Sequence, residues 1–557
     1  MVRVAALLIA RPLVPLSQRL RRGVSRPTTW CAALGGIAFS SAAPPLDFMP
    51  GVLLGLAALY LAFAHASSVR EAAARAWLWA LAAGLVGMAF IPQVVQRFTD
   101  LGWPGGALAL LLLCAFQALH WGAGAAIAQA LRLRFGVPVP LAFGALVFIA
   151  ISLPTVIAWS PAAVLSPWPV FIQLADVIGE RGVSLLLALA AALAVTPLRR
   201  YLEPGFTPLR WRSVTAHVGF AALLLTGLGI HGALRMRDVE RHQAALPRVK
   251  LGIVQAAVEA RLRWKPEARQ MILQRLRGLT RQAEREGAEL VLWPEAAYTY
   301  TLPRDLRRAP ADERRILGDG VRGPILFGLL TRELPSKRRF NSATLLESDG
   351  DLQKPQDKLA LLWFGETVPL SEYLPFLGRL FRRSGYLSAG SSVELLHHGP
   401  ARIGVLNCYE DILPGVGRRI ARARPNLLVN VTNDAWFGPT TEPELHLRLS
   451  VLRAVEARLD LVRAVNLGVP AWIDATGRIR QRGDATRQSI LHVAPGLNDE
   501  SPTLYTKVGD IPLWVGLLLT ALAAALRKLK QAPTVKSAAG RVTRHDAIAT
   551  ERDPSAP

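Results

Sequence analysis

The sequence predicts a bundle of about eight transmembrane helices joined to a separate α/β domain. The first observation is composition: 51% of the 557 residues are hydrophobic, which exceeds what an ordinary soluble enzyme needs. The second is that apolar tracts of membrane-spanning length recur before residue 246 and once more near the carboxyl terminus. The third is that the polar block between them, residues 247–507, alternates strand-like and helix-like patterns, which is typical of a layered α/β domain.

A transmembrane helix needs about 20 mainly apolar residues to cross a hydrocarbon core of ~30 Å. Tracts of this kind predict seven spans ahead of the polar block and one after it. The predicted spans are Trp30 to Pro44, Pro50 to Ala66, Ala76 to Val95, Ala107 to Leu131, Val139 to Trp159, Val183 to Val195, Val214 to Leu234 and Ile511 to Leu526. The first and sixth tracts are short, so the number of spans is approximate.

Positive charges predict the orientation of these spans, because Lys and Arg near span ends are retained in the cytoplasm. With the amino terminus inside, the cytoplasmic segments contain Arg19, Arg21, Arg22, Arg26, Arg70, Arg75, Arg132, Arg134, Arg199, Arg200, Arg210 and Arg212. The opposite loops contain little beyond Arg97 and Arg181. The carboxyl-terminal tail is also basic, so an even number of spans suits both ends. The polar block is then expected on the outer face of the membrane.

These boundaries divide the chain into five segments. They are a cytoplasmic amino-terminal segment (1–28), a transmembrane domain of about seven helices (29–246), an extracytoplasmic catalytic domain (247–507), a carboxyl-terminal transmembrane helix (508–530) and a disordered cytoplasmic tail (531–557). A cleavable signal peptide is not expected, because the short apolar stretch Val4 to Ala10 is interrupted by Arg11 and no small-residue cleavage site follows.

The formal net charge of +24 raises the question of a nucleic-acid partner. Much of that charge lies beside the predicted spans, where it sets topology and meets anionic lipid head groups. Inside the polar block, arginines between 261 and 285 are interspersed with glutamates, which suits a solvated helix face. No nucleic-acid-binding motif accompanies them. We therefore expect a membrane partner and no nucleic acid.

Hydrophobic periodicity predicts the elements of the polar block in order. The expected strands are 250–255, 288–295, 323–329, 340–347, 401–406, 426–431, 461–466 and 471–474, and the expected helices are 267–286, 414–423 and 442–458. Strands that alternate with helices predict an α/β layered domain, whose active residues follow the strand ends.

Three strand ends carry complementary chemistry. Glu295 follows one strand, Lys358 follows Gln-Asp, and Cys408 ends the strand that begins at residue 401. A carboxylate that deprotonates a thiol, a cation that stabilises a tetrahedral oxyanion and a sulfur that holds the acyl group suffice for acyl transfer. Each residue alone has a plainer interpretation, since a free cysteine is more often a small core residue and a Glu or Lys is more often solvated.

The order and wording of these motifs resemble the nitrilase (carbon-nitrogen hydrolase) superfamily, and most closely its membrane branch, the apolipoprotein N-acyltransferase family. The motifs are Trp293-Pro294-Glu295, Lys358 followed by Phe364-Gly365-Glu366, Cys408-Tyr409-Glu410, and Asn433-Asp434-Ala435-Trp436-Phe437-Gly438. The early 39–48 segment, the seven-plus-one arrangement of spans and the 503–510 segment before the last span also look like that family.

The resemblance implies an αββα sandwich in a multi-pass protein of the bacterial inner membrane, with its catalytic domain facing the periplasm or cell exterior. It implies that Cys408 takes an acyl chain from a phospholipid such as phosphatidylethanolamine, forms a thioester, and passes the chain to the amino-terminal cysteine amine of a diacylglyceryl apolipoprotein. By matching position, Glu295 is the general base, Lys358 the oxyanion stabiliser, and Glu366, Tyr409 and Glu410 supporting residues. Trp264 shapes substrate binding.

We add Trp363 and Phe364 as substrate-binding residues, because residues 359–364 are an apolar run that could form an arm in the outer leaflet. A core strand is the alternative interpretation of that run. No cofactor and no metal are expected, and we expect a monomer. His446 is interpreted as a hydrogen-bonded helix residue and not as a catalytic base.

The chain departs from the family pattern at two places. It lacks the usual His-Leu-Val-Pro after Lys358, and it has Asn466-Leu467-Gly468 where Asn-Thr-Gly is usual. Both changes bear on the acyl donor and acceptor more than on the chemistry. The alternative function is a membrane-anchored amidase that hydrolyses a carbon-nitrogen bond through the same thioester chemistry.

Overall fold

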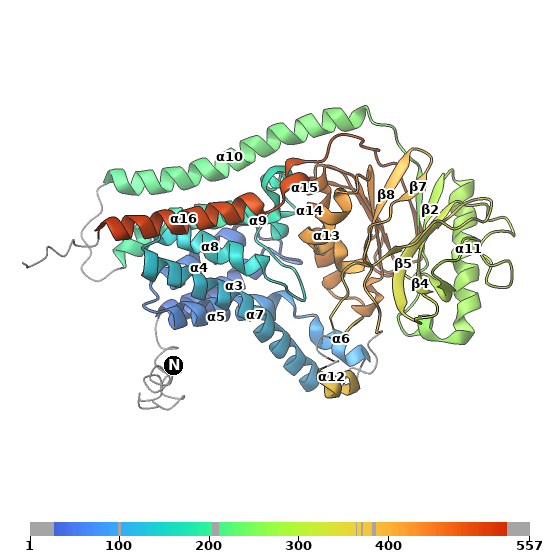
Figure 1. Ribbon diagram of the computed structural model, residues 1–557, viewed down its shortest axis with the longest axis horizontal. Coiled ribbons are helices and arrows are strands. Elements are labelled where there is room, and N and C mark those ends of the chain that lie inside the picture. Colours follow the sequence, from blue (N-terminus) through green and yellow to red (C-terminus); the bar gives the residue numbers. More distant parts are fainter. Residues whose placement is uncertain are drawn as a thin grey trace, which may run out of the picture.

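The computed structural model describes residues 27–98, 102–202, 211–363, 365–368, 371, 373–380 and 386–531. A helical part and an α/β part lie end to end along the longest axis of the molecule (Figure 1). Nearly all of the predicted amino-terminal segment and of the predicted tail, and Phe364, lie outside the described residues. The backbone of Trp264 is described but its side chain is not.

The helical part contains nine helices among the described residues. They are α3 (Pro27–Ser40), α4 (Pro50–Ala64), α5 (Val69–Gly87), α6 (Ile91–Phe98), α7 (Gly102–Phe135), α8 (Val139–Ser152), α9 (Ala175–Tyr201), α10 (Trp211–Ala244) and α16 (Ile511–Gln531). Every predicted apolar tract overlaps a helix, and the third extends over both α5 and α6. The first and fifth tracts were predicted too long, because α3 ends at Ser40 and α8 at Ser152. Although α16 comes from the other end of the chain, it packs against α7 and is part of the same helical bundle.

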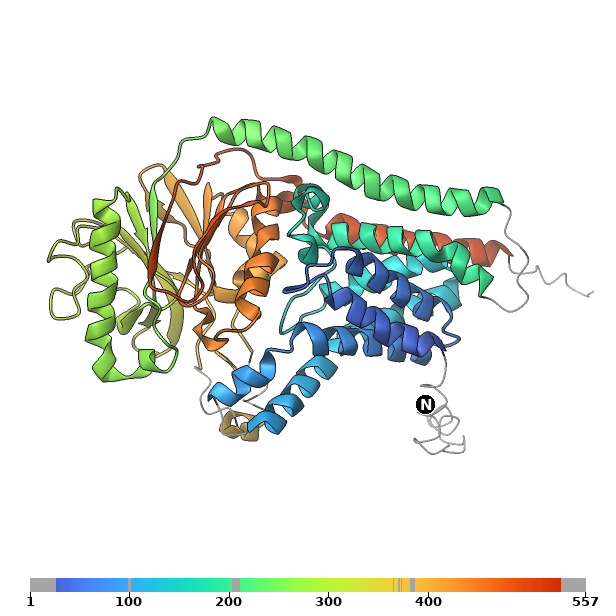
Figure 2. The same cartoon turned by 180° about the vertical axis from the view of Figure 1, so that it is seen from behind.

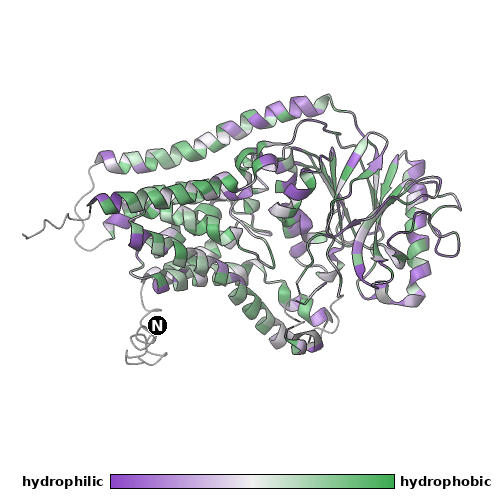
Figure 3. Ribbon diagram, in the orientation of Figure 1, coloured by the Kyte–Doolittle hydropathy of each residue, from purple (hydrophilic) through white to green (hydrophobic). Residues whose placement is uncertain are grey.

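Length and apolar composition allow four of these helices to cross a membrane, namely α7, α9, α10 and α16. The pair α5 and α6 forms a fifth candidate, although its two members are bent by 58°. The apolar helices α4 and α8 contain only 15 and 14 residues, which at 1.5 Å per residue falls short of a ~30 Å hydrocarbon core. Hydrophobic residues dominate the helical part and hydrophilic residues the outer helix of the α/β part (Figure 3).

The α/β part consists of two sheets that pack face to face. The first has the order β13-β1-β2-β4-β5-β6 with β3 paired to β4, and the second has the order β12-β11-β10-β9-β8-β7. The strands of the first sheet are β1 (Leu251–Gln255), β2 (Leu290–Leu292), β3 (Tyr298–Pro303), β4 (Ile325–Arg332), β5 (Arg339–Leu346), β6 (Gln356–Asp357) and β13 (Ser489–Val493). Those of the second are β7 (Leu396–His398), β8 (Ala401–Asn407), β9 (Leu427–Thr432), β10 (Leu461–Val465), β11 (Ala471–Ile473) and β12 (Ile479–Arg482).

Helices cover the outer face of each sheet. The helix α11 (Arg269–Arg285) packs on the first sheet, and α13 (Pro414–Ala421) and α14 (Glu442–Ala457) pack on the second (Figures 1 and 2). The fully buried hydrophobic side chains between the two sheets are aliphatic, and they include Ile253, Val405 and Val429. The layers are therefore helix, sheet, sheet and helix, which confirms the predicted αββα sandwich.

Helix α14 also forms the junction with the helical part. Its apolar residues share one buried cluster with the helices that precede the α/β part. At its carboxyl end, Arg453 donates to Glu180 of α9 at 2.5 Å, and Arg458 donates to Asp176 of α9 at 2.9 Å. All four charged side chains are buried. Because a buried charge is costly without its partner, these pairs fix the two parts in one relative position.

A break in α9 creates this docking surface. Gly179 has φ of +70° inside the helix, and the aromatic ring of Tyr505 lies against it so closely that a Cβ there would come within 2.2 Å of the ring. The break frees the backbone amide of Glu180, which donates to the carboxylate of Glu456 at 2.8 Å. A glycine is required at this position for both the backbone angle and the contact.

Candidate active site

The three predicted strand-end residues meet between the two sheets. Glu295 follows β2 and Lys358 follows β6 of the first sheet, whereas Cys408 follows β8 of the second. Glu295 and Lys358 are buried, and Cys408 is partly exposed. Cys408 is therefore the member of the three that reaches the protein surface, while the two charged groups stay out of bulk water.

Lys358 lies between two carboxylates. Its Nζ is 2.8 Å from Glu366 Oε2 and 3.6 Å from Glu295 Oε1. Burial by itself lowers the pKa of Lys358, but the negative charges of Cys408 when it is ionised, Glu366 and Glu295 raise it well above the usual value. Lys358 is therefore a permanent cation beside the sulfur.

Asn341 ties the two carboxylates together. Its Nδ2 donates to Glu295 Oε1 at 2.6 Å and to Glu366 Oε1 at 2.9 Å. The backbone amide of Leu362 donates to the other oxygen of Glu366 at 2.9 Å. Asn341 was not among the predicted site residues, because an asparagine inside a strand belongs to no recognisable sequence motif. Its place on β5, next to the Ser342–Asp357 pair and opposite Lys358, whose backbone amide donates to the Asn341 carbonyl oxygen at 2.8 Å, emerges only from the sheet register.

Cys408 occupies a strained turn at the start of a 3-10 helix (Cys408–Ile412), with φ of +57°. A non-glycine residue in the left-handed region is held there by its surroundings, and such residues gather at active sites. Burial raises the pKa of the Cys408 thiol well above its usual value, and the charge of Glu295 raises it further, whereas Lys358 lowers it. The resting sulfur is thus a protonated thiol that needs a base at the moment of attack.

Glu410 fixes the turn that carries the sulfur. Its carboxylate accepts hydrogen bonds from the backbone amides of Asn407 (2.8 Å), Leu359 (2.6 Å) and Ala360 (2.8 Å). One side chain thereby holds the cysteine turn against the segment that follows Lys358. Burial raises the pKa of Glu410 to about 7, and the hydrogen bonds from the backbone act in the opposite direction.

Tyr409 closes another side of the site. Its hydroxyl donates to the carbonyl oxygen of Leu361 at 2.8 Å, and its ring lies 5.3 Å from Lys358 Nζ, within cation–π range. Trp363 is 36% exposed, and the stretch 359–363 is an irregular loop. The alternative interpretation of this stretch as a core strand is therefore wrong.

A second buried cluster lies behind the cysteine turn. His446 of α14 shares hydrogen bonds with Asp411 (Nε2, 2.9 Å) and Asp434 (Nδ1, 3.0 Å), and Arg463 pairs with Asp411. The interpretation of His446 as a hydrogen-bonded helix residue is confirmed. Burial lowers its pKa, but the two carboxylates raise it to about 10, so the imidazole is charged.

Glu442 of α14 lies beside this cluster. The ligand atoms of Asp434, Glu442 and His446 are within 4.8 Å of one another, which is close enough to hold a metal ion. This group of residues was not predicted from the sequence, because only the fold brings Asp434 close to the two residues of α14. Both ring nitrogens of His446 already contact carboxylates, and the guanidinium of Arg463 lies against the same cluster. The arrangement is that of a buried ion-pair network.

Two sequence profiles of known families match this chain. The sequence profile described as "Carbon-nitrogen hydrolase" matches residues 250–494, and the profile described as "Apolipoprotein N-acyltransferase N-terminal domain" matches residues 35–193. Among solved structures, an amidase from Nesterenkonia sp. is 18% identical, with a TM-score of 0.35, and the match covers 49% of this chain and 98% of the amidase.

Curated relatives match over almost the full length. The apolipoprotein N-acyltransferase of Geobacter metallireducens is 30% identical over 89% of this chain and 94% of its own length. That of Caulobacter vibrioides is 30% identical over 89% of this chain and 93% of its own length, and that of Nitrosomonas europaea is 27% identical over 87% and 95%. The chain belongs to the apolipoprotein N-acyltransferase family.

Proposed function

We propose that this protein transfers an acyl chain from a phospholipid to the amino-terminal cysteine amine of a diacylglyceryl apolipoprotein. The observation that carries the proposal is the contact of a buried Glu295 and Lys358 with each other beside a partly exposed Cys408, in a chain whose relatives bear the name of this activity. In this proposal Glu295 is the base, Lys358 the oxyanion stabiliser and Cys408 the nucleophile.

In the first half-reaction, Glu295 accepts the thiol proton as the sulfur of Cys408 attacks the ester carbonyl carbon. The charged Lys358 stabilises the negative oxygen that forms. When the tetrahedral intermediate collapses, the carbon–oxygen bond of the ester breaks and Glu295 returns the proton to the departing lysophospholipid. A thioester on Cys408 remains.

In the second half-reaction, the neutral amine of the lipoprotein attacks the thioester carbonyl. Glu295 accepts a proton from the amine, the carbon–sulfur bond breaks and the proton returns to the sulfur. The products are an amide and the free thiol. Because a thioester retains most of the reactivity of an ester and an amide is more stable, the cycle needs no nucleotide.

The supporting residues act by position in this proposal. Glu366 and Asn341 hold Lys358 and Glu295 in place, and Glu410 and Tyr409 hold the cysteine turn against the loop after Lys358. Trp264, Trp363 and Phe364 are proposed to contact the substrate. The alternative, a membrane-anchored amidase, leaves the apolar helices without a purpose, because a soluble amide needs no membrane.

We also propose that all eight tracts contribute membrane spans, that residues 247–507 face the periplasm or cell exterior, and that the protein resides in the bacterial inner membrane as a monomer. The placement of Lys and Arg supports this orientation. The short helices α3, α4 and α8 would then cross as members of a packed bundle, in which neighbouring helices and local thinning of the bilayer accommodate their length.

Mass spectrometry of the purified protein tests the proposal. Incubation with phosphatidylethanolamine should add one acyl chain to Cys408, and a diacylated lipopeptide should remove it faster than water does. Cys408→Ser should lose the adduct, whereas Cys31→Ser, which changes a cysteine in α3, should keep it. Discharge of the adduct by water alone would favour the amidase. Labelling of Cys408 in intact cells with a membrane-impermeant maleimide tests the orientation.

A further inference from the structure

Two arginines depart from the charge bias that predicts the orientation of the chain, because Arg97 and Arg181 lie in the loops predicted to be outside. Arg181 has a carboxylate partner, since its guanidinium pairs with Asp510 at the start of the last helix. No carboxylate among the described residues forms an ion pair with Arg97, whose side chain is partly exposed. The positive charge of Arg97 on the predicted outer side of the membrane therefore needs another explanation.

The side chain of Arg97 is held against a loop of the α/β part. Gly438, at φ of +63°, lies so close to the Arg97 guanidinium that a Cβ would come within about 2 Å of it. Beside it, Phe437 contacts Phe90 edge to face, with 5.9 Å between the ring centroids. A glycine at this position makes room for the guanidinium, and the aromatic pair fixes the bend before α6.

A second arginine comes to the same place from another loop. The exposed Arg261 donates a hydrogen bond to the backbone carbonyl of Arg97. Its guanidinium has further N–H groups, and it too forms no ion pair with a carboxylate in the described part of the chain. Two arginines from segments 164 residues apart are thus brought into contact, and neither forms an ion pair with a carboxylate among the described residues.

Both loops lead directly to the reacting groups. The loop of Arg261 follows β1, and the carboxyl end of β1 lies beside the end of β2 that leads to Glu295, because the two strands pair in parallel. The loop of Gly438 follows β9, and Asn430 near the end of β9 donates to the backbone carbonyl oxygen of Cys408 at 2.8 Å. The arginine pair therefore lies at the rim of the cysteine site, on the side of α6.

We propose that Arg97 and Arg261 form a binding site for the phosphate of the phospholipid that donates the acyl chain. The proposal rests on the function proposed above and names the part of the substrate that this rim recognises. Guanidinium groups match phosphate oxygens with paired, charge-assisted hydrogen bonds. In a phospholipid, the glycerol backbone alone separates the phosphate from the ester carbonyl, so a phosphate held at the rim would direct the ester toward Cys408.

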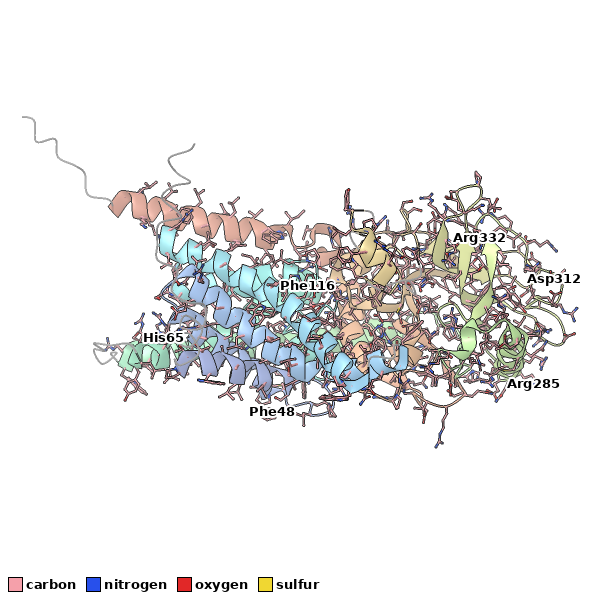
Figure 4. All side chains as sticks on the ribbon, turned by 90° about the horizontal axis from the view of Figure 1, so that it is seen from below. Phe48, His65, Phe116, Arg285, Asp312 and Arg332 are labelled. Carbon is pink, nitrogen blue, oxygen red and sulfur yellow. The ribbon has the colours of Figure 1, made fainter. Side chains whose placement is uncertain are left out.

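The test measures acylation of Cys408 by two donors with identical acyl chains, phosphatidylethanolamine and diacylglycerol, in detergent and without an acceptor. Arg97→Gln and Arg261→Gln should each lower the rate at subsaturating phosphatidylethanolamine by about tenfold, which is the loss of ~1.4 kcal/mol in binding. The rate at saturating phosphatidylethanolamine and the rate with diacylglycerol should change less than twofold. The control is Arg285→Gln, an exposed arginine at the end of α11, at the far end of the α/β part (Figure 4).

The outcomes separate this proposal from its premise. An equal loss with both donors would show that the arginines only support the fold of the site, and unchanged rates with phosphatidylethanolamine would show that they do not bind its phosphate; either result overturns the inference. If the unsubstituted protein failed to acylate Cys408 with any lipid, the proposed function itself would fail.

Discussion

Replacement of Lys358 by methionine is the sharpest test of the proposed chemistry. Methionine keeps the length and the apolar stem of the side chain but removes the ammonium group, which is 2.8 Å from Glu366 and 3.6 Å from Glu295. The variant loses the cation that lowers the pKa of the Cys408 thiol, and it loses the group that would stabilise the oxyanion. Both effects slow the first half-reaction.

The expected magnitude follows from the second effect. Removal of one preorganised oxyanion-stabilising group from a site of this kind costs about 10²–10³-fold in rate, or ~3–4 kcal/mol. The first effect adds to it, because burial and the charge of Glu295 then raise the pKa of Cys408 unopposed by Lys358. Alkylation of Cys408 by iodoacetamide should accordingly reach its half-maximal rate at a higher pH in the variant.

The assay is the rate of acyl-adduct formation on Cys408, followed by mass spectrometry after addition of phospholipid. The matched control is Lys354→Met, since Lys354 is 54% exposed and pairs with Glu394 at 2.6 Å on the surface. The control should acylate at the normal rate. A Lys358→Met protein that remains folded and acylates within about threefold of the unsubstituted rate would refute the assignment of Lys358 as oxyanion stabiliser.

Three further predictions concern residues that position the site or join the two parts. Asn341→Leu removes two hydrogen bonds to buried carboxylates and should slow thioester formation by about tenfold or more, measured as above; a change under twofold would contradict this. His446→Leu should lower the unfolding free energy by about 3 kcal/mol at neutral pH. The pKa of His446 in the folded protein, about 10, lies above the ordinary 6.5, so the stabilisation by His446 is complete below pH 6.5 and disappears as pH rises toward 10. Thermal unfolding curves of the variant and of the unsubstituted protein should therefore converge across that range. Arg453→Met should cost about 3–5 kcal/mol in detergent because it strands the buried Glu180, whereas Arg402→Met, which breaks a surface pair, should cost less than ~1 kcal/mol.

Sequence patterns predicted the regular elements of the α/β part well where the elements are buried. The strand predicted at 426–431 is β9, and the helix predicted at 442–458 is α14, each within one residue at its ends. These segments are long apolar or amphipathic runs, whose period is unambiguous. The strands β3, β6, β7, β12 and β13 were not predicted, because they are short or half-exposed and have no clean alternation.

Most side chains that line the candidate site were selected from the sequence, but Asn341 and the buried cluster behind the cysteine turn were not. Glu295, Lys358 and Cys408 were identified at strand ends, and the resemblance supplied Glu366, Tyr409 and Glu410, all of which the structure places beside them. Asn341 was missed because its role depends on which strand lies next to β6. The cluster around His446 was missed because it joins four segments that are separate in the sequence.

The dual role of α14 has a practical consequence for attempts to prepare the catalytic half as a soluble protein. Deletion of residues 1–246 would leave Arg453 and Arg458 on a newly exposed apolar face, each without the carboxylate from α9 that now neutralises it. The same helix carries His446 toward the cysteine turn, so damage at one end would reach the other. Crystallisation trials or inhibitor screens on such a fragment would sample a distorted site, and the whole chain in lipid is the form on which they should be based.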